Sequence, residues 1–395
     1  MTLRRTPVDF VVTERETGAI ASILRHDASP DHPFAVYRLS KTSLTTPEGV
    51  GMLARALGVR PGAASYAGLK DKHAVTSQLV TLAAPPDAPD AARGPRWEAT
   101  RLGWSPRHVR ADDIDANAFT IVVRDLARET CIAMDRRRAA LSRGDDLLVV
   151  NYFGDQRFGS ARHGKGFAAR ALLRGDFETA LRLAVGTPAR KDSGRTRTFT
   201  RLCASHWGDW ARLARDLPRC PERKPFEALA RGATMRDAFA SLPAFLQTML
   251  VEAFQSHLWN DAARRLAAAL GASGDLRSDD AFGPMLFLAA PAVTPGLEHL
   301  DLPLPAPGTQ PREPWFIPMR DALAAEGITT ADLRIPGLAK PYFGEAPRRF
   351  IVVVRGLRVL APEPDDLTPG RLKRLVSFDL PRGAYATVVL RALGH

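Results

Sequence analysis

Long uncharged hydrophobic runs are missing from this sequence of 395 residues. No stretch reaches the roughly 18 to 20 apolar residues of a membrane-spanning helix, so we expect no such helix. The first residues, Met1 to Asp9, lack the apolar centre of a secretory signal, so we expect no signal either. Hydrophobic residues make up 45% and charged residues 25%, which is typical of a soluble globular protein. Because a chain of this length is too long to fold around one ordinary hydrophobic core, we expect two or more domains.

Cysteine is also scarce. The chain has Cys131, Cys203 and Cys220, an odd number with no C-x-x-C spacing. This argues against a disulfide framework or a zinc site and suits a reducing cytoplasm. His73 has no second His or Cys at metal-ligand spacing, so we interpret it as a polar loop residue and expect no metal.

Acidic residues are outnumbered. Lys plus Arg exceed Asp plus Glu by 55 − 43 = 12, which favours a polyanionic partner such as nucleic acid. Arginine dominates the excess, and its planar group suits phosphate and stacks on bases. The alternative is that the excess charge has no specific partner and only keeps the chain soluble. The same two interpretations apply to a basic cluster that either binds nucleic-acid phosphates or forms a solvated loop: Arg190, Lys191, Arg195, Arg197 and Arg201.

The pattern of apolar residues changes twice along the chain. Strand-like runs dominate the first 150 residues or so, helical spacing dominates from about residue 160 to 300, and strand-like runs return after a proline-rich segment at 301–314. We therefore predict an α+β protein in which the two ends of the chain build one sheet-based domain and the middle is a mainly helical insertion.

Local signals predict one helix and two strand pairings. Residues 47–58 are expected to form a helix with Thr46 as its N-cap and Gly58 as its stop. A strand pair is expected within residues 97–126. A hairpin is expected within residues 349–360, with its turn at Arg355-Gly356.

The segment 67–78 draws attention because it places Asp71 between Lys70 and Lys72, shortly after Gly68. A carboxylate kept ionised by lysines is a candidate nucleophile or general base on an anionic substrate. By spacing alone, such a run is also typical of a solvated turn. The two lysines are neighbours of the carboxylate, phosphate contacts or simply solvated side chains.

Several motifs resemble one family. Gly68-x-Lys70-Asp71-x-x-Ala74-x-Thr76-x-Gln78 is similar to the signature of the TruD family of transfer-RNA pseudouridine synthases at all six fixed positions. Further segments resemble that family in the same order: Pro7-x-Asp9-Phe10-x-Val12-x-Glu14, Lys41-x-x-x-Thr45, Asn117-x-Phe119, residues 151–159, residues 253–260 and residues 378–387. The resemblance spans residues 4 to 393, nearly the whole chain.

The resemblance implies a pseudouridine synthase catalytic core, a mixed sheet with flanking helices, built from residues 1–154 and 343–395. Residues 155–342 would form the family's insertion domain. It also implies a cofactor-free isomerisation of uridine to pseudouridine in transfer RNA, at uridine 13 of the D arm in the bacterial members. We expect a cytoplasmic monomer that uses no metal and no membrane.

The resemblance also assigns site residues. Asp71 falls on the catalytic aspartate, and the positions that contact the target nucleotide are Phe10, Asn117, Phe119 and Tyr385. The family usually has phenylalanine where this chain has Tyr385. Residues with a possible supporting role are Arg4, Lys41, Lys70 and Thr76.

The chemistry expected at these positions follows from the substrate. A base inside folded RNA must be extruded before its C5 and the ribose C1′ can react, and aromatic rings can hold the flipped base. Each ring has an alternative as a core aromatic, and Asn117 either reads the uracil edge or is a turn residue. Whether Asp71 attacks C6 or the ribose stays open. The rival hypothesis is a non-catalytic RNA-binding protein or RNA chaperone on the same scaffold.

Overall fold

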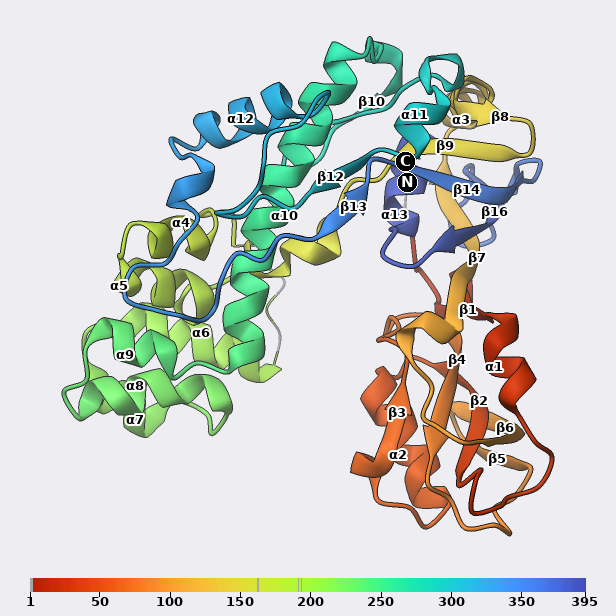
Figure 1. Ribbon diagram of the computed structural model, residues 1–395, viewed down its shortest axis with the longest axis horizontal. Helices are drawn as coiled ribbons and strands as arrows, with labels where there is room; N and C mark the ends of the chain where they lie inside the picture. Colours follow the sequence, from red (N-terminus) through yellow and green to blue (C-terminus); the bar gives the residue numbers. More distant parts are fainter. Residues whose placement is uncertain (1–2, 162, 191, 193) are drawn as a thin grey trace. The chain divides into compact units, whose positions relative to one another are not determined.

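The computed structural model describes residues 3–161, 163–190, 192 and 194–395, and the chain forms two compact units (Figure 1). Unit 1 comprises Met1–Val149, Ala289–Pro291 and Val352–His395, and unit 2 comprises Val150–Leu288 and Ala292–Ile351. We describe each unit by itself.

Unit 1 is built on one mixed sheet whose strands follow the order β5-β6-β2-β4-β1-β7-β16-β14-β9-β8. β1 runs parallel to β4, while β7 is antiparallel to both β1 and β16. The strands are β1 Phe10–Glu16, β2 Phe34–Thr42, β3 Ala64–Tyr66, β4 Val75–Leu82, β5 Ala91–Gly94, β6 Trp97–Ser105, β7 Ile114–Leu126, β8 Ser142–Arg143, β9 Asp146–Val150, β14 Ile351–Val359, β15 Glu363–Pro364 and β16 Leu372–Pro381. The flanking helices are α1 Gly18–Ile23, α2 Thr46–Ala56, α3 Arg128–Leu141 and α13 Ala386–Ala392.

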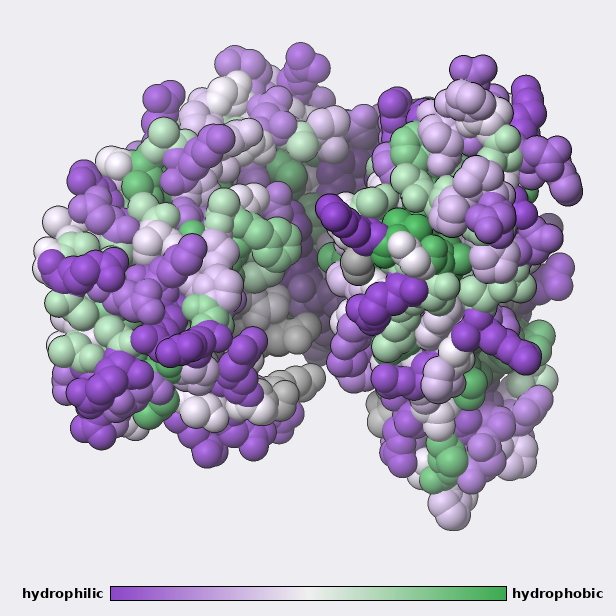
Figure 2. All heavy atoms as spheres, turned by 90° about the horizontal axis from the view of Figure 1, so that it is seen from below, coloured by the Kyte–Doolittle hydropathy of each residue, from purple (hydrophilic) through white to green (hydrophobic). Residues whose placement is uncertain are grey.

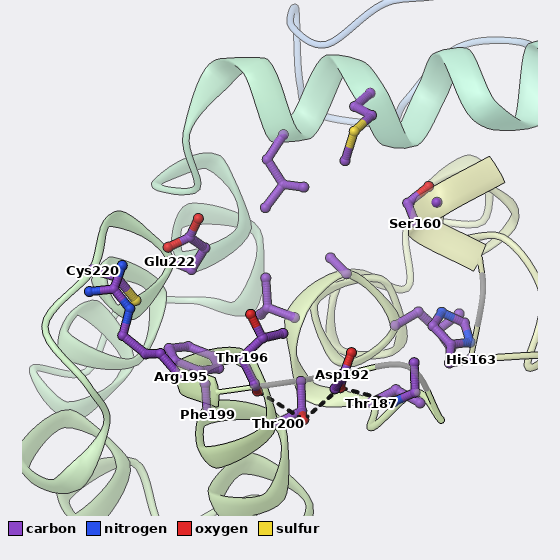
Figure 3. Close-up of a pocket in the computed structure, with 17 residues that line it drawn as sticks. Ser160, His163, Thr187, Asp192, Arg195, Thr196, Phe199, Thr200, Cys220 and Glu222 are labelled. Atoms are coloured by element: carbon purple, nitrogen blue, oxygen red, sulfur yellow. Dashed lines mark hydrogen bonds between the residues drawn. The ribbon is translucent and has the colours of Figure 1, made fainter. Parts of the chain in front are cut away.

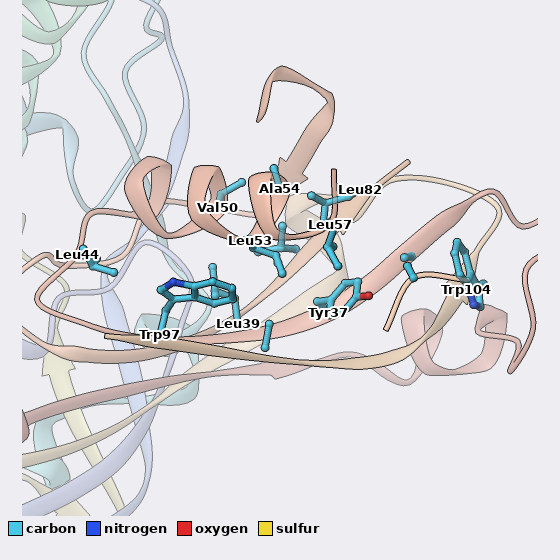
Figure 4. Close-up of a cluster of buried hydrophobic side chains, with 14 residues drawn as sticks. Tyr37, Leu39, Leu44, Val50, Leu53, Ala54, Leu57, Leu82, Trp97 and Trp104 are labelled. Carbon is cyan, nitrogen blue, oxygen red and sulfur yellow. The ribbon is translucent and has the colours of Figure 1, made fainter. Parts of the chain in front are cut away.

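Helix α2 covers part of this sheet because its apolar side chains recur at helical spacing. Leu53 and Ala54 are fully buried against Tyr37 and Leu39 of β2 and against Trp97 of β6 (Figure 4). Burial of a leucine-sized side chain contributes about 1.5–3 kcal/mol, so this contact fixes the helix on the sheet.

The N-cap of α2 differs from the prediction. Thr45, not Thr46, caps the helix: its hydroxyl accepts a hydrogen bond from the amide of Glu48, and the Glu48 carboxylate accepts one from the amide of Thr45. This reciprocal capping box satisfies two backbone donors at once. It also leaves the hydroxyl of Thr46 available for contacts elsewhere.

Two predicted strand connections are wrong. The strands within 97–126 form, but β6 pairs with β2 and β5, whereas β7 pairs with β1 and β16. Residues 351–359 form the single strand β14 instead of a hairpin. Gly356, with φ 60°, produces a bulge against β16 rather than a turn, because one left-handed residue can be absorbed within a strand.

Unit 2 is mainly helical, which together with the mixed sheet of unit 1 confirms the predicted α+β class. Its main helices are α4 Ala168–Leu173, α5 Phe177–Leu181, α6 Gly194–His206, α7 Trp210–Asp216, α8 Lys224–Ala230, α9 Met235–Ala240, α10 Ala244–Ala269, α11 Pro295–Glu298 and α12 Phe316–Ala325. Its short 3-10 and π turns include η4 Asp155–Ala161, η5 Arg182–Gly186 and η6 Pro221–Arg223, and its short strands are β10 Arg277–Ser278, β11 Met285–Leu286, β12 Asp301–Pro303 and β13 Pro347–Arg349. Helix α6 begins inside the segment 187–198, where the sequence suggested only turns.

Helix α10 is the centre of unit 2, and two motifs meet on it. The side chain of Asn260 accepts a hydrogen bond from the amide of Phe153 at 2.8 Å and donates one to its carbonyl at 3.0 Å. Gln255 donates to the carbonyls of Pro305 and Gly344. These side chains satisfy backbone groups of irregular segments that would otherwise be buried without partners.

The surface is mostly polar on the face that Figure 2 shows, where apolar side chains lie in smaller groups. Among the helices of the described ranges, none has both the length and the apolar character needed to cross a membrane.

A buried charge cluster ties the N-terminal segment of unit 1 to its sheet. Arg124 of β7 donates to Asp9 at 2.9 Å and to Asp365 and Asp366 at 2.8 Å each. Burial by itself would raise the pKa of Asp365, but the amides of Leu367 and Asp125 and the Arg124 guanidinium outweigh it and lower that pKa. The cluster therefore holds Asp9, and with it the start of β1, against the sheet.

We predict that Arg124→Met lowers the free energy of unfolding by about 3–5 kcal/mol, because buried carboxylates lose their counter-ion. Since the pKa of Asp365 is lowered on folding, its contribution is present above its unfolded value of about 3.9 and is lost as pH falls below it. Urea denaturation at pH 7 and at acidic pH measures the free energy of unfolding. The variant should be less stable at pH 7, and its stability should fall less on acidification than that of the wild type.

The matched control is Arg128→Met, because Arg128 is exposed on α3. An Arg124→Met variant that is no less stable than this control would show that the cluster does not stabilise unit 1.

Candidate active site

One face of the unit 1 sheet gathers most of the predicted site residues. Along β1, side chains at alternate positions share a face, and directly paired residues on neighbouring strands share it too. Val12 is paired with Thr76 on β4 and with Phe119 on β7. Thr76 is in turn paired with Lys41 on β2. The residues brought to this face are therefore Phe10, Lys41, Thr76, Asn117 and Phe119.

Asp71 lies in the loop of residues 67–74 between β3 and β4, which we call the Asp71 loop. One carboxylate oxygen of Asp71 accepts a hydrogen bond from the amide of His73 at 2.9 Å. Beneath the loop, the ammonium of Lys41 donates to the carbonyl of Leu44 at 2.7 Å and to that of Asp71 at 3.3 Å. The side chain and the backbone of Asp71 are thus both held.

A buried ion pair anchors the same loop. Lys70 Nζ lies 2.6 Å from Glu14 Oε1, and Glu14 is only 1% exposed. The other oxygen of Glu14 accepts a hydrogen bond from the amide of Leu79 at 2.8 Å. Lys70 is therefore occupied by a protein carboxylate, which argues against its use as a phosphate contact.

The backbone of the Asp71 loop has further fixed points. The amide of Lys70 donates to the hydroxyl of Thr46 at 2.9 Å, and that hydroxyl donates to Gln78 Oε1 at 2.9 Å. Gln78 Nε2 donates to the carbonyl of Gly68 at 3.2 Å. The chain from Gly68 to Lys70 therefore follows a defined path.

Arg4 supplies a cation to the Asp71 carboxylate. Arg4 Nη1 lies 2.8 Å from Asp71 Oδ2, and the guanidinium sits over the ring of Phe10, 4.2 Å from its centroid. Arg4 has a left-handed backbone with φ 59°, a conformation that costs energy outside glycine. The ion pair and the cation–π contact offset that cost and place a positive charge beside Asp71.

The aromatic residues form a row across the sheet. The ring of Phe119 lies 6.0 Å from that of Phe10 and 5.5 Å from that of Phe378, between centroids. Phe10 and Phe378 are each 3% exposed, whereas Phe119 is half-buried. Phe119 therefore has the ring with the most surface still open, and Phe10 supports it from beneath Arg4.

Asn117 lies on the same strand as Phe119, two residues before it, and Tyr385 lies just beyond β16. Asn117 is paired with Leu380, near the end of β16, and half-buried Tyr385 follows that strand as the N-cap of α13. The carbonyl oxygen of the Asn117 amide is buried and accepts no hydrogen bond from any described residue. A buried acceptor without a donor is costly, so this oxygen is suited to a donor from a ligand.

Burial perturbs Lys41. Its side chain is 1% exposed, and this burial is the main reason that its pKa falls to about 8, although the nearby Asp71 charge partly offsets the effect. In the part of the chain that the structure describes, no group of three or more His, Cys, Asp or Glu side chains could hold a metal ion.

Three residues that shape the site were not predicted: Glu14, Thr46 and Gln78 in their roles as supports of the Asp71 loop. A signal for Glu14 is present in the sequence. It occupies the inward position of β1 two residues after Val12, where an acidic side chain in an apolar series requires a buried cationic partner.

Comparison with known proteins agrees with these features. A family model described as tRNA pseudouridine synthase D (TruD) matches residues 1–281. A relative from Aquifex aeolicus named tRNA pseudouridine synthase D is 28% identical and covers 99% of this chain and 97% of its own. A Natronomonas pharaonis relative named "Probable tRNA pseudouridine synthase D" is 32% identical and covers 98% of this chain and 92% of its own.

The fold is also found among solved structures. The crystal structure of a TruD-type chain from Methanosarcina mazei matches with a TM-score of 0.70 at 23% identity, covering 99% of this chain and 92% of that one. The architecture is thus that of a pseudouridine synthase core interrupted by a helical insertion. The chain belongs to the TruD family of tRNA pseudouridine synthases, as its motifs predicted.

We predict that Glu14→Gln lowers the free energy of unfolding by about 1–3 kcal/mol, because Lys70 keeps its charge but loses its buried counter-ion. The amides of residues 68–74 should also exchange hydrogen faster. Glu16→Gln is the control, since Glu16 is on the same strand but exposed, paired with Arg38. Equal effects of the two variants would contradict an anchoring role for Glu14.

We predict a pH-dependent stability difference between the wild type and Lys41→Met. A lysine whose pKa falls on folding destabilises the folded state while it is protonated. That cost is constant below about pH 8 and disappears as pH rises towards the unfolded value of about 10.4. The wild type should therefore gain stability relative to Lys41→Met across this window in urea denaturation, and parallel pH curves would contradict the shift.

Proposed function

We propose that this chain converts uridine to pseudouridine in transfer RNA, with Asp71 as its one catalytic carboxylate. The observation that carries the proposal is the setting of Asp71. Its carboxylate is fixed by the amide of His73 and the guanidinium of Arg4, in unit 1 together with a sheet face that presents Phe119 and Asn117.

The reaction breaks the bond between N1 of uracil and C1′ of ribose and makes one between C5 and C1′, while C5 loses its proton and N1 gains one. Product and substrate have the same atoms and oxidation state, so the step needs no oxidant, reductant or group donor. A fixed carboxylate serves it either by attack on C6 or by action at C1′. Arg4 orients Asp71 and balances its charge in both courses.

The target base would be held by the aromatic row and by Asn117. Extrusion of a base costs a few kcal/mol, and stacking on an aromatic ring returns about 1–3 kcal/mol. Phe119 and Tyr385 are the half-buried rings suited to this contact, while Phe10 supports Phe119 and Arg4. The carbonyl oxygen of Asn117, which accepts no hydrogen bond from a described residue, is an acceptor for the N3–H of uracil.

We assign the catalytic domain to residues 1–154 and 343–395 and the insertion domain to residues 155–342. We propose that the protein acts as a cytoplasmic monomer. The target position, uridine 13 of the D arm, rests on the resemblance of the motifs to those of bacterial TruD enzymes.

We predict that cells lacking this protein lose pseudouridine at one D-arm position, and that the wild-type gene restores it whereas Asp71→Asn does not. The substitution keeps the shape of the side chain and removes its charge, so tRNA binding should stay within about threefold while turnover falls by at least about 10³-fold. Pseudouridine mapping of cellular RNA and filter binding measure the two quantities.

The control is Asp87→Asn, since Asp87 is an exposed aspartate in the loop before β5. Full activity of Asp71→Asn would refute the assignment of the catalytic carboxylate. An unchanged pseudouridine pattern in the deletion strain, with tRNA binding intact, would instead favour a binding-only protein.

A further inference from the structure

Helix α6 of unit 2 has an unusual charge pattern. Its segment Gly194–His206 carries Arg195, Arg197 and Arg201 but no acidic residue. On the following helical segments, arginines pair with nearby carboxylates in Arg212–Asp216, Arg223–Glu227 and Arg236–Asp237. The three arginines of α6 pair with no carboxylate among the described residues. Acidic side chains of the described part of unit 2 therefore do not neutralise these charges.

Two cavities adjoin α6 and divide these arginines between them. One, of about 360 Å³, is lined by Arg195, Thr196 and Phe199, with Cys220 and Glu222 facing them (Figure 3). Its mixed lining points to no ligand class. The second, of about 380 Å³, is lined by a smaller set: Pro188, Ala189, Arg190, Asp192, Arg197, Thr200 and Arg201. We call the second one the arginine cavity.

The arginine cavity is held in shape by its own hydrogen bonds. Asp192 is the one acidic residue among the described lining residues, and its carboxylate already accepts hydrogen bonds from the amide of Ala189 at 3.0 Å and the hydroxyl of Thr200 at 2.9 Å (Figure 3). Arg197 Nε donates to the carbonyl of Asp192 at 2.7 Å. This bond fixes Arg197 and leaves its terminal N–H groups for another acceptor.

The stability of unit 2 by itself does not explain why these arginines lie close together. Arg197 and Arg201 are four residues apart on one helix face, where like charges repel. Arg197 also lies in the first turn of α6, where the helix dipole disfavours a cation. An anion in the cavity would remove both costs, and planar guanidinium groups match phosphate oxygens in geometry.

We propose that the arginine cavity binds a backbone phosphate of the RNA substrate. The inference rests on the proposed function for the identity of the substrate, and it adds an anchoring site on unit 2. Arg190, Arg197 and Arg201 are all exposed, which suits a phosphate carried on a large polyanion rather than an enclosed small ion. Of the basic cluster predicted from the sequence, Arg195 belongs to the other cavity, and Lys191 lies outside the described residues.

The test compares two triple variants that each remove three positive charges from unit 2. The first is Arg190→Gln, Arg197→Gln, Arg201→Gln. The control is Arg231→Gln, Arg312→Gln, Arg334→Gln, because these arginines are exposed and none lines the arginine cavity. Dissociation constants for tRNA are measured over a series of salt concentrations, with Asp71→Asn added to each protein to prevent turnover.

We expect the first variant to bind tRNA about tenfold more weakly or worse near physiological salt. The slope of log affinity against log salt should become shallower by about 0.7–0.9 for each phosphate that the protein no longer neutralises. With Asp71 intact, KM should rise while kcat at saturating tRNA changes little. The single variant Arg201→Gln, at an exposed position, should show the same trend if the triple variant folds poorly.

Three outcomes would overturn the inference: equal effects of both triple variants, an unchanged salt slope, or tight binding of inorganic phosphate at constant ionic strength without any effect on tRNA. The last result would identify a small-anion site. Failure of the proposed function is distinguishable, because the wild type would then make no pseudouridine whatever the variants bind.

Discussion

The buried ion pair between Glu14 and Lys70 is the constraint on which the proposed active site depends. Two charges removed from water stabilise a fold only when their remaining hydrogen-bonding atoms are satisfied. Here the second oxygen of Glu14 takes the amide of Leu79, while the backbone of Lys70 is held by Thr46. Because Asp71 is the next residue, the position of a strand side chain on β1 decides where the carboxylate lies.

A second buried charge acts on the partner of that carboxylate. Arg124 holds Asp9, and the carboxylate of Asp9 accepts the amide of Thr6, which fixes the segment that leads to Arg4. The two members of the Arg4–Asp71 pair thus reach each other from separate segments, each tied to the same sheet. A register error in β1 would displace both, since a shift of one residue turns Glu14 and Phe10 to the opposite face.

The sequence predicted what depends on local pattern. The strand-like runs at the two ends of the chain and the helical spacing from about residue 160 to 300 were indicated correctly, and the motifs indicated the family, which the comparisons confirm. Strand partners are long-range, so nothing local showed that β7 pairs with β1 and β16 instead of β6. Gly356 was misjudged because turns and bulges both use a left-handed glycine.

The residues of the candidate site were predictable from the sequence, but their supporting contacts were not. The motifs named residues that the sheet brings to one face, but the supporting roles of Glu14, Thr46 and Gln78 depend on which side chains meet after folding. The same holds for Lys70, whose partner is 56 positions away along the chain (70 − 14 = 56).

The place of β16 in the sheet has a consequence for synthesis on the ribosome. Unit 2 lies wholly before residue 352, so all of its chain has been made while unit 1 still lacks β16 and α13. Until then, one edge of the 13-residue strand β7 has no partner, and open edges of this kind invite pairing with other chains. A nascent chain that has not yet reached β16 therefore has all of unit 2 but an open, aggregation-prone edge on β7 of unit 1.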